Sequence, residues 1–372
     1  MSGADGRQHV GVLGGGQLGR MLALAGYPLG LRFRVLEPAA DAPAGHLAEH
    51  MAGGYDDPDV LDRFAAGLDV VTYEFENVPV AAAAHLAQRV PVYPPPGALS
   101  TAQDRVEEKR CFQQLEIPTP AFSPVANRRD LAAAMRVIKP RGVLKTRRLG
   151  YDGKGQALIR TPADVETAWQ ALSGQALAGQ ALIYEAFVPF DRELSILAVR
   201  GRDGATACYP LVENHHRDGI LRLSLAPAPD CPPMLQAVAE EYARRVLERL
   251  DYVGVLAIEL FQVGDTLLAN EMAPRVHNSG HWTIEGAVTS QFENHLRAVC
   301  GLPLGDTAPR GHAAMINLIG ALPDRTAVLA IPGAHLHDYG KMPRAGRKLG
   351  HITLVEDDRA ALQAKIERII TL

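Results

Sequence analysis

The sequence predicts a multidomain α/β and α+β protein with a small βα unit, a lid unit and a region of antiparallel sheet. In the first hundred residues, short β runs alternate with helix-like stretches. Beyond residue 193, alternating strands are separated by Asp-Gly turns, which favour antiparallel pairing. The 372 residues are too many for one simple core. We therefore predict domains at 1–98, 99–187 and 188–372.

Composition excludes several classes of protein. The formal net charge of −4 is small, so we expect neither a nucleic-acid partner nor a polybasic membrane arm. The N-terminus is polar, and no window approaches the roughly 20 apolar residues of a membrane span. Cys111, Cys208, Cys231 and Cys300 are scattered, which argues against a disulfide framework or a zinc site. A cytoplasmic location is the expectation.

A glycine-rich turn dominates the first unit. His9 to Leu13 reads as a strand, Gly14-Gly-Gly-Gln-Leu-Gly19 follows it, and Leu31 to Leu36 returns as a strand that ends at Glu37. This pattern fits the dinucleotide fingerprint and, taken alone, supports an NAD enzyme. The glycines strictly indicate only that backbone approaches an anion at a helix N-terminus, so a sugar phosphate fits equally well.

A third strand, Val70 to Tyr73, leads into Glu74-Phe-Glu-Asn-Val-Pro79. Acidic and amide groups at the carboxyl end of such a strand lie where open α/β sheets bind ligands. Glu76 is therefore either a ligand or a turn residue that caps the next helix. The Pro-rich run from Val90 to Gly97 should continue neither helix nor central strand, and we place the domain boundary there.

The middle of the chain predicts a phosphate-binding lid. Ser100 to Leu115 reads as a helix that carries Arg105 and Lys109, and the strand Val143 to Arg147 carries Lys145. Gly150-Tyr-Asp-Gly-Lys-Gly-Gln156 then forms a loop whose amides can wrap phosphates, although a tight Asp-Gly hairpin turn is the simpler alternative.

Further strands and one long helix follow. Ala181 to Glu185 and Glu193 to Val199 read as strands, and Asn214-His-His216 has no third ligand at a spacing that would suit zinc. Pro232-Pro233 begins an amphipathic helix. Its expected buried face is Leu235, Val238, Tyr242, Val246 and Leu250.

The most informative segment is a strand pair. Val253 to Val263 and Thr266 to Met272 flank a Gly-Asp turn, and a hairpin centred on the Asp would place Glu259 opposite Glu271. Like charges that face each other are destabilising, which indicates a cation between them. A site with only oxygen ligands favours Mg²⁺, which completes its coordination shell with substrate phosphates. Two solvated surface carboxylates are the alternative.

The order of these elements resembles the ATP-grasp superfamily, with a half-Rossmann domain ahead of the ATP-grasp fold. Within it, the chain resembles the 5-(carboxyamino)imidazole ribonucleotide synthase family from about Val10 to Leu354. The resemblance is carried by the motifs Gly14-Gly-Gly-Gln-Leu-Gly-Arg-Met21, Tyr73-Glu-Phe-Glu-Asn-Val-Pro79, Gly150-Tyr-Asp-Gly-Lys-Gly-Gln156 and Asn270-Glu-Met-Ala-Pro-Arg-Val-His-Asn-Ser-Gly-His-Trp282. Ala273 stands where many ATP-grasp enzymes, though not this family, have Asn.

The resemblance implies ATP and Mg²⁺ as cofactors, with Glu259 and Glu271 holding the metal. The implied ATP ligands are Arg105, Lys145, Gly150, Tyr151, Gly153, Gly155, Gln156, Glu185, Ala186, Phe187, Val188, Glu193, His216, Asn270 and Glu271. Aminoimidazole ribonucleotide and bicarbonate are the implied substrates. Gly16, Gln17, Leu18, Glu76, Asn278, Lys341, Arg347 and Lys348 are the implied ribonucleotide ligands, although a solvated basic loop is the default for the last three.

The implied chemistry is phosphorylation of bicarbonate to carboxyphosphate, which needs positioning and charge neutralisation. Arg275 would stabilise the carboxyphosphate, and His277 would take the proton from the attacking amine, with Asp152 on the lid as a rival. Lys154 and Tyr151 would reach the second substrate from the same loop.

Three other functions stay open at this stage. Another ATP-grasp ligase, such as a formate-dependent glycinamide ribonucleotide transformylase, would share the ATP half. An NAD(P)-dependent oxidoreductase would use the glycine turn and Glu37 but leave the Glu259/Glu271 pair unexplained. A non-catalytic nucleotide-binding module would not need all of the charged residues. The family resemblance implies a homodimer.

Overall fold

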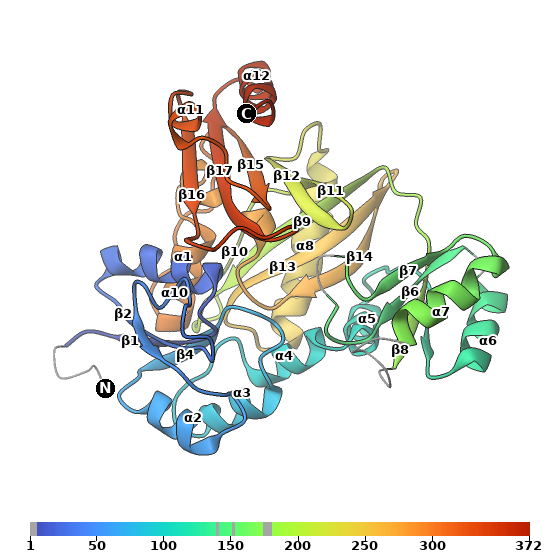
Figure 1. Cartoon of the computed structure of the whole chain (residues 1–372), viewed down its shortest axis with the longest axis horizontal. Coiled ribbons are helices and arrows are strands. Elements are labelled where there is room, and N and C mark those ends of the chain that lie inside the picture. The colour runs from blue at the N-terminus through green and yellow to red at the C-terminus, as the bar shows by residue number, and fades with distance from the viewer. Residues whose placement is uncertain (1–5, 139–140, 151–152, 174–180) are drawn as a thin grey trace.

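A computed structural model describes residues 6–138, 141–150, 153–173 and 181–372. The first unit is a four-stranded parallel sheet in the order β3-β2-β1-β4 (Figure 1). Its elements are β1 (His9–Leu13), α1 (Gln17–Gly26), β2 (Arg32–Leu36), β3 (Glu49–Met51), α2 (Pro58–Ala65), β4 (Val70–Tyr73) and α3 (Val80–Ala87). The predicted strands and the helix after the glycine turn are confirmed.

The link to the second unit differs from the prediction. Val92 pairs with Val71 in a parallel bridge, and α4 (Pro96–Ala102) begins inside the Pro-rich run, because Pro is well suited to the first position of a helix. The single helix expected over Ser100–Leu115 is wrong. Asp104 interrupts it and starts α5 (Arg105–Gln114), whose Val106 N–H donates to the Asp104 carboxylate.

The second unit is a small antiparallel sheet in the order β5-β8-β6-β7, which stands to one side of the molecule in Figure 1. Its elements are β5 (Phe122–Val125), α6 (Arg128–Ile138), β6 (Gly142–Thr146), β7 (Gln156–Ile159), α7 (Val165–Ser173) and β8 (Leu182–Ala186). The predicted lid, Gly150 to Gln156, follows β6 in the sequence and ends at the first residue of β7.

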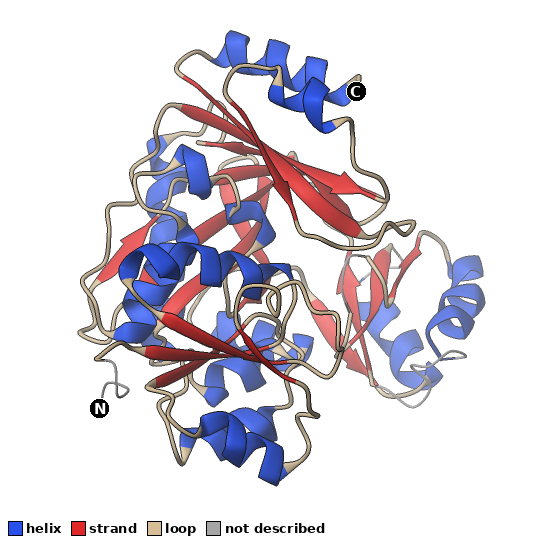
Figure 2. Cartoon of the chain, turned by 60° about the vertical axis from the view of Figure 1, so that its left-hand side comes forward, coloured by secondary structure: helices blue, strands red, loops and turns tan. Residues whose placement is uncertain are grey.

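The third unit is built on a nine-stranded antiparallel sheet, as the Asp-Gly turns predicted. Eight strands run in the order β14-β13-β9-β11-β12-β15-β17-β16, and β10 pairs with β9. The strands are β9 (Arg192–Arg200), β10 (Thr206–Cys208), β11 (Val212–Arg217), β12 (Ile220–Ala226), β13 (Gly254–Val263), β14 (Thr266–Ala273), β15 (His312–Ile319), β16 (Ala334–Asp338) and β17 (Lys348–Glu356). The helices are α8 (Pro233–Arg249), α9 (Thr283–Gly286), α10 (Gln291–Cys300), α11 (Arg325–Leu329) and α12 (Arg359–Ile370). Figure 2 shows α11 and α12 at the far end of this sheet from the first unit.

Helix α8 begins where Pro232-Pro233 predicted, but its buried face is rotated slightly. Leu235 and Val246 are buried as expected, whereas the centre of the contact is formed by small residues such as Ala239 and Ala243. Small side chains let the helix lie close to the sheet, and the larger predicted residues are left half-buried at the margins.

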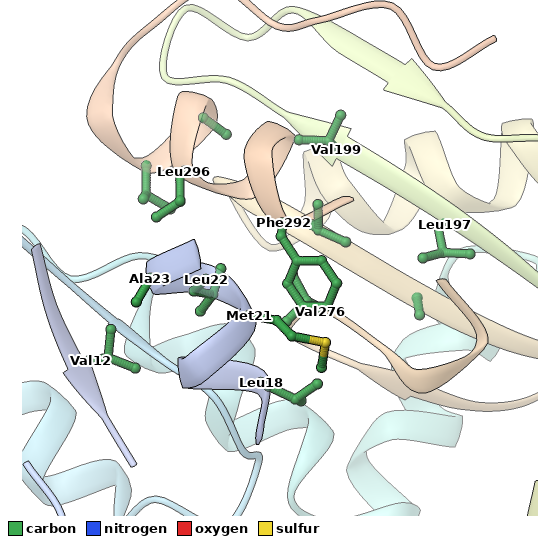
Figure 3. Close-up of a cluster of buried hydrophobic side chains, with 14 of the residues drawn as sticks. Val12, Leu18, Met21, Leu22, Ala23, Leu197, Val199, Val276, Phe292 and Leu296 are labelled. Atoms are coloured by element: carbon green, nitrogen blue, oxygen red, sulfur yellow. The ribbon is translucent and has the colours of Figure 1, made fainter. Parts of the chain in front are cut away.

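The first and third units share one apolar core (Figure 3). Leu18, Met21 and Leu22 of α1 pack with Phe292 and Leu296 of α10. At about 25 cal/mol per Å² of apolar surface, burial of side chains this large holds the glycine turn firmly against the large sheet. None of the helices in the described ranges is both long and apolar enough to cross a membrane.

Candidate active site

The two predicted metal carboxylates do face each other. Glu259 on β13 pairs with Glu271 on β14, which confirms the predicted partner. The register is produced differently, however, because Val263 pairs with Thr266 across a two-residue turn. A β-bulge at Glu259/Leu260 then leaves Asn270 as the extra residue on β14. Without the bulge, Glu259 would lie opposite Asn270, and Glu271 would point to the other face.

The two carboxylates differ in their electrostatic environment. Arg105 Nη1 lies 2.5 Å from Glu271 Oε2. Burial raises the pKa of Glu271, but Arg105 and then Lys145 outweigh it and lower the pKa to about 2. Burial and the neighbouring Glu271 raise the pKa of Glu259 to about 7. One of the two negative charges is therefore uncompensated, which suits a cation.

The side chains available as ligands limit which cation could bind between these two carboxylates. Among the described residues, no cluster of three or more His, Cys, Asp or Glu side chains could hold a metal ion. Two carboxylates on one face fit Mg²⁺, which typically takes one or two carboxylates and completes its shell with water and substrate phosphates.

Residues from all three predicted units line one cavity of about 60 Å³. The first unit contributes Glu76, and the second contributes Arg105 and Gly150. The third contributes both metal carboxylates together with Arg275 and His277, which the sequence had placed in the same motif. Arg275 and His277, two of the expected catalytic residues, thus lie at one cavity with Glu259, Glu271 and Glu76.

Glu76 pairs with Arg275 across the boundary between the first and third units. The Arg275 Nε lies 2.5 Å from the Glu76 Oε2. Burial raises the pKa of Glu76, but Arg275 outweighs it and holds the pKa below its ordinary value. The alternative that Glu76 caps the next helix is wrong, because α3 begins after Pro79 with no side-chain cap.

His277 is buried beside the metal pair. Its Nε2 lies 3.3 Å from Glu259 Oε1, and its Nδ1 lies 2.9 Å from the Ser279 hydroxyl. Burial, and then the positive charges of Arg275 and Lys348, lower the pKa of His277 to about 3. The imidazole is therefore neutral at physiological pH.

Two lysines converge on Glu185 of β8. The Lys145 Nζ lies 2.9 Å from Glu185 Oε2 and the Lys109 Nζ 3.4 Å from the same oxygen. Lys109 also donates to the Asn270 carbonyl at 3.0 Å. Burial raises the pKa of Glu185, but Lys145 and Lys109 outweigh it and lower the pKa. Sequence reasoning named Lys109 without giving it a role, although its i,i+4 spacing from Arg105 places both on one helix face.

The expected nucleotide ligands form two further contacts. Glu193 is hydrogen-bonded through its carboxylate to the Nδ1 of His216, and this contact raises the pKa of His216 against the lowering effect of burial. In the predicted hinge, Ala186 ends β8, Val188 follows two residues later, and the Arg141 guanidinium lies 3.9 Å from the centre of the Phe187 ring.

The lid loop reaches the β11–β12 turn. A Cβ on Gly153 would come within 3.0 Å of Gly219, and Gly153 itself has a positive φ of 73°. Gln156 starts β7 and pairs with Lys145, and Lys154 and Gly155 lie in the turn before it. Tyr151 and Asp152, which the sequence assigned to this loop, lie outside the described residues.

The glycine turn already holds an anion that belongs to the chain. Glu74, which sequence reasoning did not single out, accepts hydrogen bonds from Gly16 N and, at 2.7 Å, from Gly19 N. Gly15 N donates to Glu37 Oε2 at 3.1 Å. A Cβ on Gly14 would lie 2.5 Å from Glu74 Cγ, which explains the glycine. In this conformation the amides are thus occupied by Glu74 and Glu37, and the binding of a ligand anion at the turn stays a prediction.

The basic C-terminal segment contacts the same turn. Lys341 donates a hydrogen bond from its Nζ to the Gln17 side chain, and its Nζ lies 5.7 Å from the Tyr339 ring centre. The Arg347 side chain is folded onto the Met342 carbonyl at 3.1 Å. Leu18 is 7% exposed in the core, so a ribonucleotide can meet it only through its backbone.

Two other expected ligands lie near this surface. Lys348 begins β17 and is close enough to Glu259 and His277 to lower the pKa of both. Asn278 exchanges two amide hydrogen bonds with Asn317, at 3.1 and 2.7 Å.

This combination of a lid sheet, paired lysines and a carboxylate hairpin defines an ATP-grasp enzyme. Comparison with known proteins agrees: residues 110–292 match the ATP-grasp domain, 7–103 the ribonucleotide synthetase preATP-grasp domain, and 313–365 the phosphoribosylaminoimidazole carboxylase C-terminal domain. The chain belongs to the N5-carboxyaminoimidazole ribonucleotide synthase family, whose members are ATP-dependent ligases of purine biosynthesis.

Individual relatives match over nearly the full length. The chain is 56% identical to N5-carboxyaminoimidazole ribonucleotide synthase of Pseudomonas aeruginosa over 98% of this chain and 99% of that protein. The crystal structure of N5-carboxyaminoimidazole ribonucleotide synthetase from Thermus thermophilus is 60% identical, with a TM-score of 0.92 and 98% coverage of both chains. The Aspergillus clavatus synthase, solved with ADP and 5-aminoimidazole ribonucleotide, is 31% identical with a TM-score of 0.89, covering 98% of this chain and 99% of that one.

These comparisons support the synthase interpretation of the sequence and not its alternatives. In this structure the Gly15, Gly16 and Gly19 amides donate to Glu37 and Glu74, so they form no open pyrophosphate cradle.

Proposed function

We propose that this chain carboxylates 5-aminoimidazole ribonucleotide with bicarbonate and ATP. Carboxyphosphate would be the intermediate, and N5-carboxyaminoimidazole ribonucleotide, ADP and phosphate the products. The observation that carries the proposal is the single cavity that joins Glu259, Glu271, Arg275 and His277 to Glu76 of the first unit. It brings the Glu259 and Glu271 carboxylates together with Glu76, which we assign to the ribonucleotide.

The ATP half of the reaction falls to the second and third units. Arg105 and Lys145 supply positive charge for the phosphates, and they are held in place by Glu271 and Glu185. The backbone of 185–188, Glu193 with His216, the Asn270 bulge and the lid residues Gly150, Gly153, Gly155 and Gln156 are the remaining ligands we assign. Phosphoryl transfer is catalysed mainly by positioning and charge neutralisation, which these groups provide.

Glu259 and Glu271 would hold Mg²⁺, and that ion neutralises phosphate charge when bound. The fit is supported by the geometry, in which Glu259 faces Glu271 across the hairpin, and by burial and the Glu271 charge, which raise the pKa of Glu259. In the chain itself, Arg105 orients Glu271, while His277 lies against Glu259.

The ribonucleotide would bind between the first unit and the C-terminal strands. Lys341 links Gln17 to this surface, and Lys348 adds a second cation beside the reaction centre. We assign Gly16, Gln17, the Leu18 backbone, Glu76, Asn278 and Arg347 to the same ligand. The Aspergillus clavatus relative was solved with ADP and 5-aminoimidazole ribonucleotide, which supports the binding of both molecules by this chain.

Bicarbonate activation requires an anion to be stabilised as it forms. Arg275 lies at the cavity with Glu76 as its partner, so its guanidinium is already oriented. One well-placed donor of this kind is worth about 3–4 kcal/mol of transition-state stabilisation. Carboxyphosphate decomposes in water, so closure of the lid is part of the mechanism, and Lys154 and Tyr151 would act from that loop.

Two roles are available to His277 in the attack of the amine. It can accept the proton of the amine, or it can donate a hydrogen bond to the carboxylated anion. Asp152 is the other proton acceptor that we propose. A His277→Asn variant with an unchanged rate and pH profile would exclude the first role.

Phosphate release with Mg-ATP and bicarbonate, with and without the ribonucleotide, tests the proposed function. Strong stimulation by 5-aminoimidazole ribonucleotide is the expected result. Bicarbonate-dependent turnover that ignores the ribonucleotide would keep the fold and reassign the substrate. A homodimer remains a proposal that rests on the family resemblance, and a cytoplasmic location remains one that rests on composition; sedimentation analysis tests the first of them.

A further inference from the structure

A chain of buried polar side chains crosses the large sheet behind His277. Asn214 on β11 and Ser224 on β12 are directly paired, and Ser195 lies on β9, the neighbour of β11 on its other side (Figure 1). These three residues and Ser279 are buried, whereas adjoining positions on the same strands belong to the apolar core. Polar groups in such surroundings are costly unless they are hydrogen-bonded, so their arrangement calls for a cause.

The hydrogen bonds run in one direction toward the imidazole. Asn214 Nδ2 donates to Ser195 Oγ at 2.9 Å, and Ser195 Oγ donates to Ser279 Oγ at 2.8 Å. Ser224 Oγ donates to Asn214 Oδ1 at 2.7 Å, so the oxygen of the same amide also has a buried partner. An amide nitrogen can only donate, so Ser195 accepts from Asn214 and donates its own hydroxyl hydrogen bond to Ser279. Ser279 is thereby left to point its hydroxyl proton at His277 Nδ1, 2.9 Å away.

The backbone reinforces this direction. Ser279 N–H also donates to His277 Nδ1, at 3.3 Å. A proton on Nδ1 would face both of these donors, so Nδ1 carries the lone pair. In the neutral ring the proton is then on Nε2, which lies 3.3 Å from Glu259 Oε1 at the cavity.

We infer that Asn214, Ser195 and Ser279 are positioning residues that hold His277 as its Nε2–H tautomer, so that the ring donates a hydrogen bond at the carboxylation centre instead of acting as the base. A neutral imidazole can serve as such a donor, and a preoriented donor needs no reorganisation when charge develops. The inference rests on the proposed function, because the donor is useful only if an anion forms beside Glu259.

The tautomer is directly observable without turnover. The ¹⁵N resonances of the imidazole nitrogens in ¹⁵N-histidine-labelled protein separate a protonated nitrogen from one with a lone pair. His277→Asn identifies the signals of His277 among the 13 histidines. We expect a protonated Nε2 in the unaltered protein. A protonated Nδ1 would overturn the inference.

Asn214→Asp tests this chain of hydrogen bonds, which we call the relay (Asn214, Ser195 and Ser279), with almost no change of shape. A carboxylate accepts from Ser195, so the Ser195 hydroxyl turns away from Ser279 and Ser279 becomes free to accept from Nδ1. We expect a measurable Nδ1–H population in this variant. Ser195→Ala, which removes the middle of the relay, is the milder second variant in case Asn214→Asp does not fold.

Kinetics give the second readout. In Ser195→Ala, kcat for ribonucleotide-stimulated phosphate release should fall about tenfold, the effect of one neutral hydrogen bond, while the KM for ATP stays unchanged. Thr353→Val is the matched control, since the Thr353 hydroxyl is equally buried and has no hydrogen-bond partner in the described structure. It should leave kcat and the His277 spectrum unaltered.

The outcomes separate the two proposals. Unaltered tautomer and kcat in both Asn214→Asp and Ser195→Ala would overturn the relay even if the ribonucleotide stimulates turnover. A protonated Nε2 that shifts in Asn214→Asp, in a protein that the ribonucleotide does not stimulate, would support the relay and reject the proposed substrate.

Discussion

Replacing Glu259 by Gln should stabilise the ligand-free protein in a pH-dependent way. Burial and Glu271 raise the pKa of Glu259 from 4.5 to about 7. At about 1.36 kcal/mol for each pH unit, ionising this group costs the folded state about 3 kcal/mol. Because the folded pKa is raised, the cost is absent below pH 4.5, grows between pH 4.5 and 7, and is constant above. Glu259→Gln removes the charge and keeps the shape, so the gain should follow the same window.

Urea unfolding in EDTA at pH 5, 6, 7 and 8 measures this difference. We expect the two proteins to be nearly equal at pH 5 and the variant to be about 3 kcal/mol more stable at pH 8. Glu271→Gln is the matched control, because it also relieves the repulsion but leaves Arg105 without its partner. The free energy of unfolding of Glu271→Gln should therefore no longer depend on pH in this window, but it should not exceed that of the unaltered protein. A constant difference between Glu259→Gln and the unaltered protein from pH 5 to pH 8 would refute the reasoning.

Three further predictions concern other charged contacts. Lys341→Met should raise the KM for the ribonucleotide about tenfold or more and leave the KM for ATP unchanged, because a hydrogen bond to a charged group is worth about 1.5–3 kcal/mol. Steady-state kinetics measure both constants, and an equal rise in the KM for ATP would contradict the assignment. Lys109→Met should lower the free energy of unfolding by about 3 kcal/mol, because it breaks a buried ion pair with Glu185, and a loss below the error of urea titration would count against it. Glu74→Gln should cost about 1–3 kcal/mol by the same measurement, because one acceptor of the glycine turn is lost, and unchanged stability would mean that the turn does not need its carboxylate.

The metal hairpin shows how far local patterns reach. Alternation and a Gly-Asp turn were enough to predict both strands and the pairing of Glu259 with Glu271. The register near the turn was not predictable in this way, because a two-residue turn alone pairs Glu259 with Asn270. The bulge corrects the register, and bulges depend on the partner strand and on side-chain packing, which single-strand periodicity does not contain.

Residues missed by the sequence analysis act through contacts that are distant along the chain. Glu74 meets the glycine turn 55 to 58 positions away, and Ser195 meets Ser279 at a separation of 84. Glu74 belongs to a recognisable motif, so an acidic residue at the end of a neighbouring parallel strand was an available signal. Ser195 offered no such signal, since a lone serine in an apolar strand is common. Only the sheet order brings it next to Asn214 and behind His277.

Three cations of the site are already paired with carboxylates of the chain itself. Arg105 pairs with Glu271, Lys145 with Glu185, and Arg275 with Glu76. Leaving a buried charge without a partner costs the folded protein about 3–5 kcal/mol. Unpaired cations in this site would therefore destabilise the protein whenever no anionic substrate is bound. Carboxylates from separate units hold the guanidinium and ammonium groups in position, and a phosphate or carboxyphosphate that arrives shares these cations with them. Folding thus already orients these Arg and Lys side chains. Substrate binding changes the anion that contacts each of them and does not need to order the side chains.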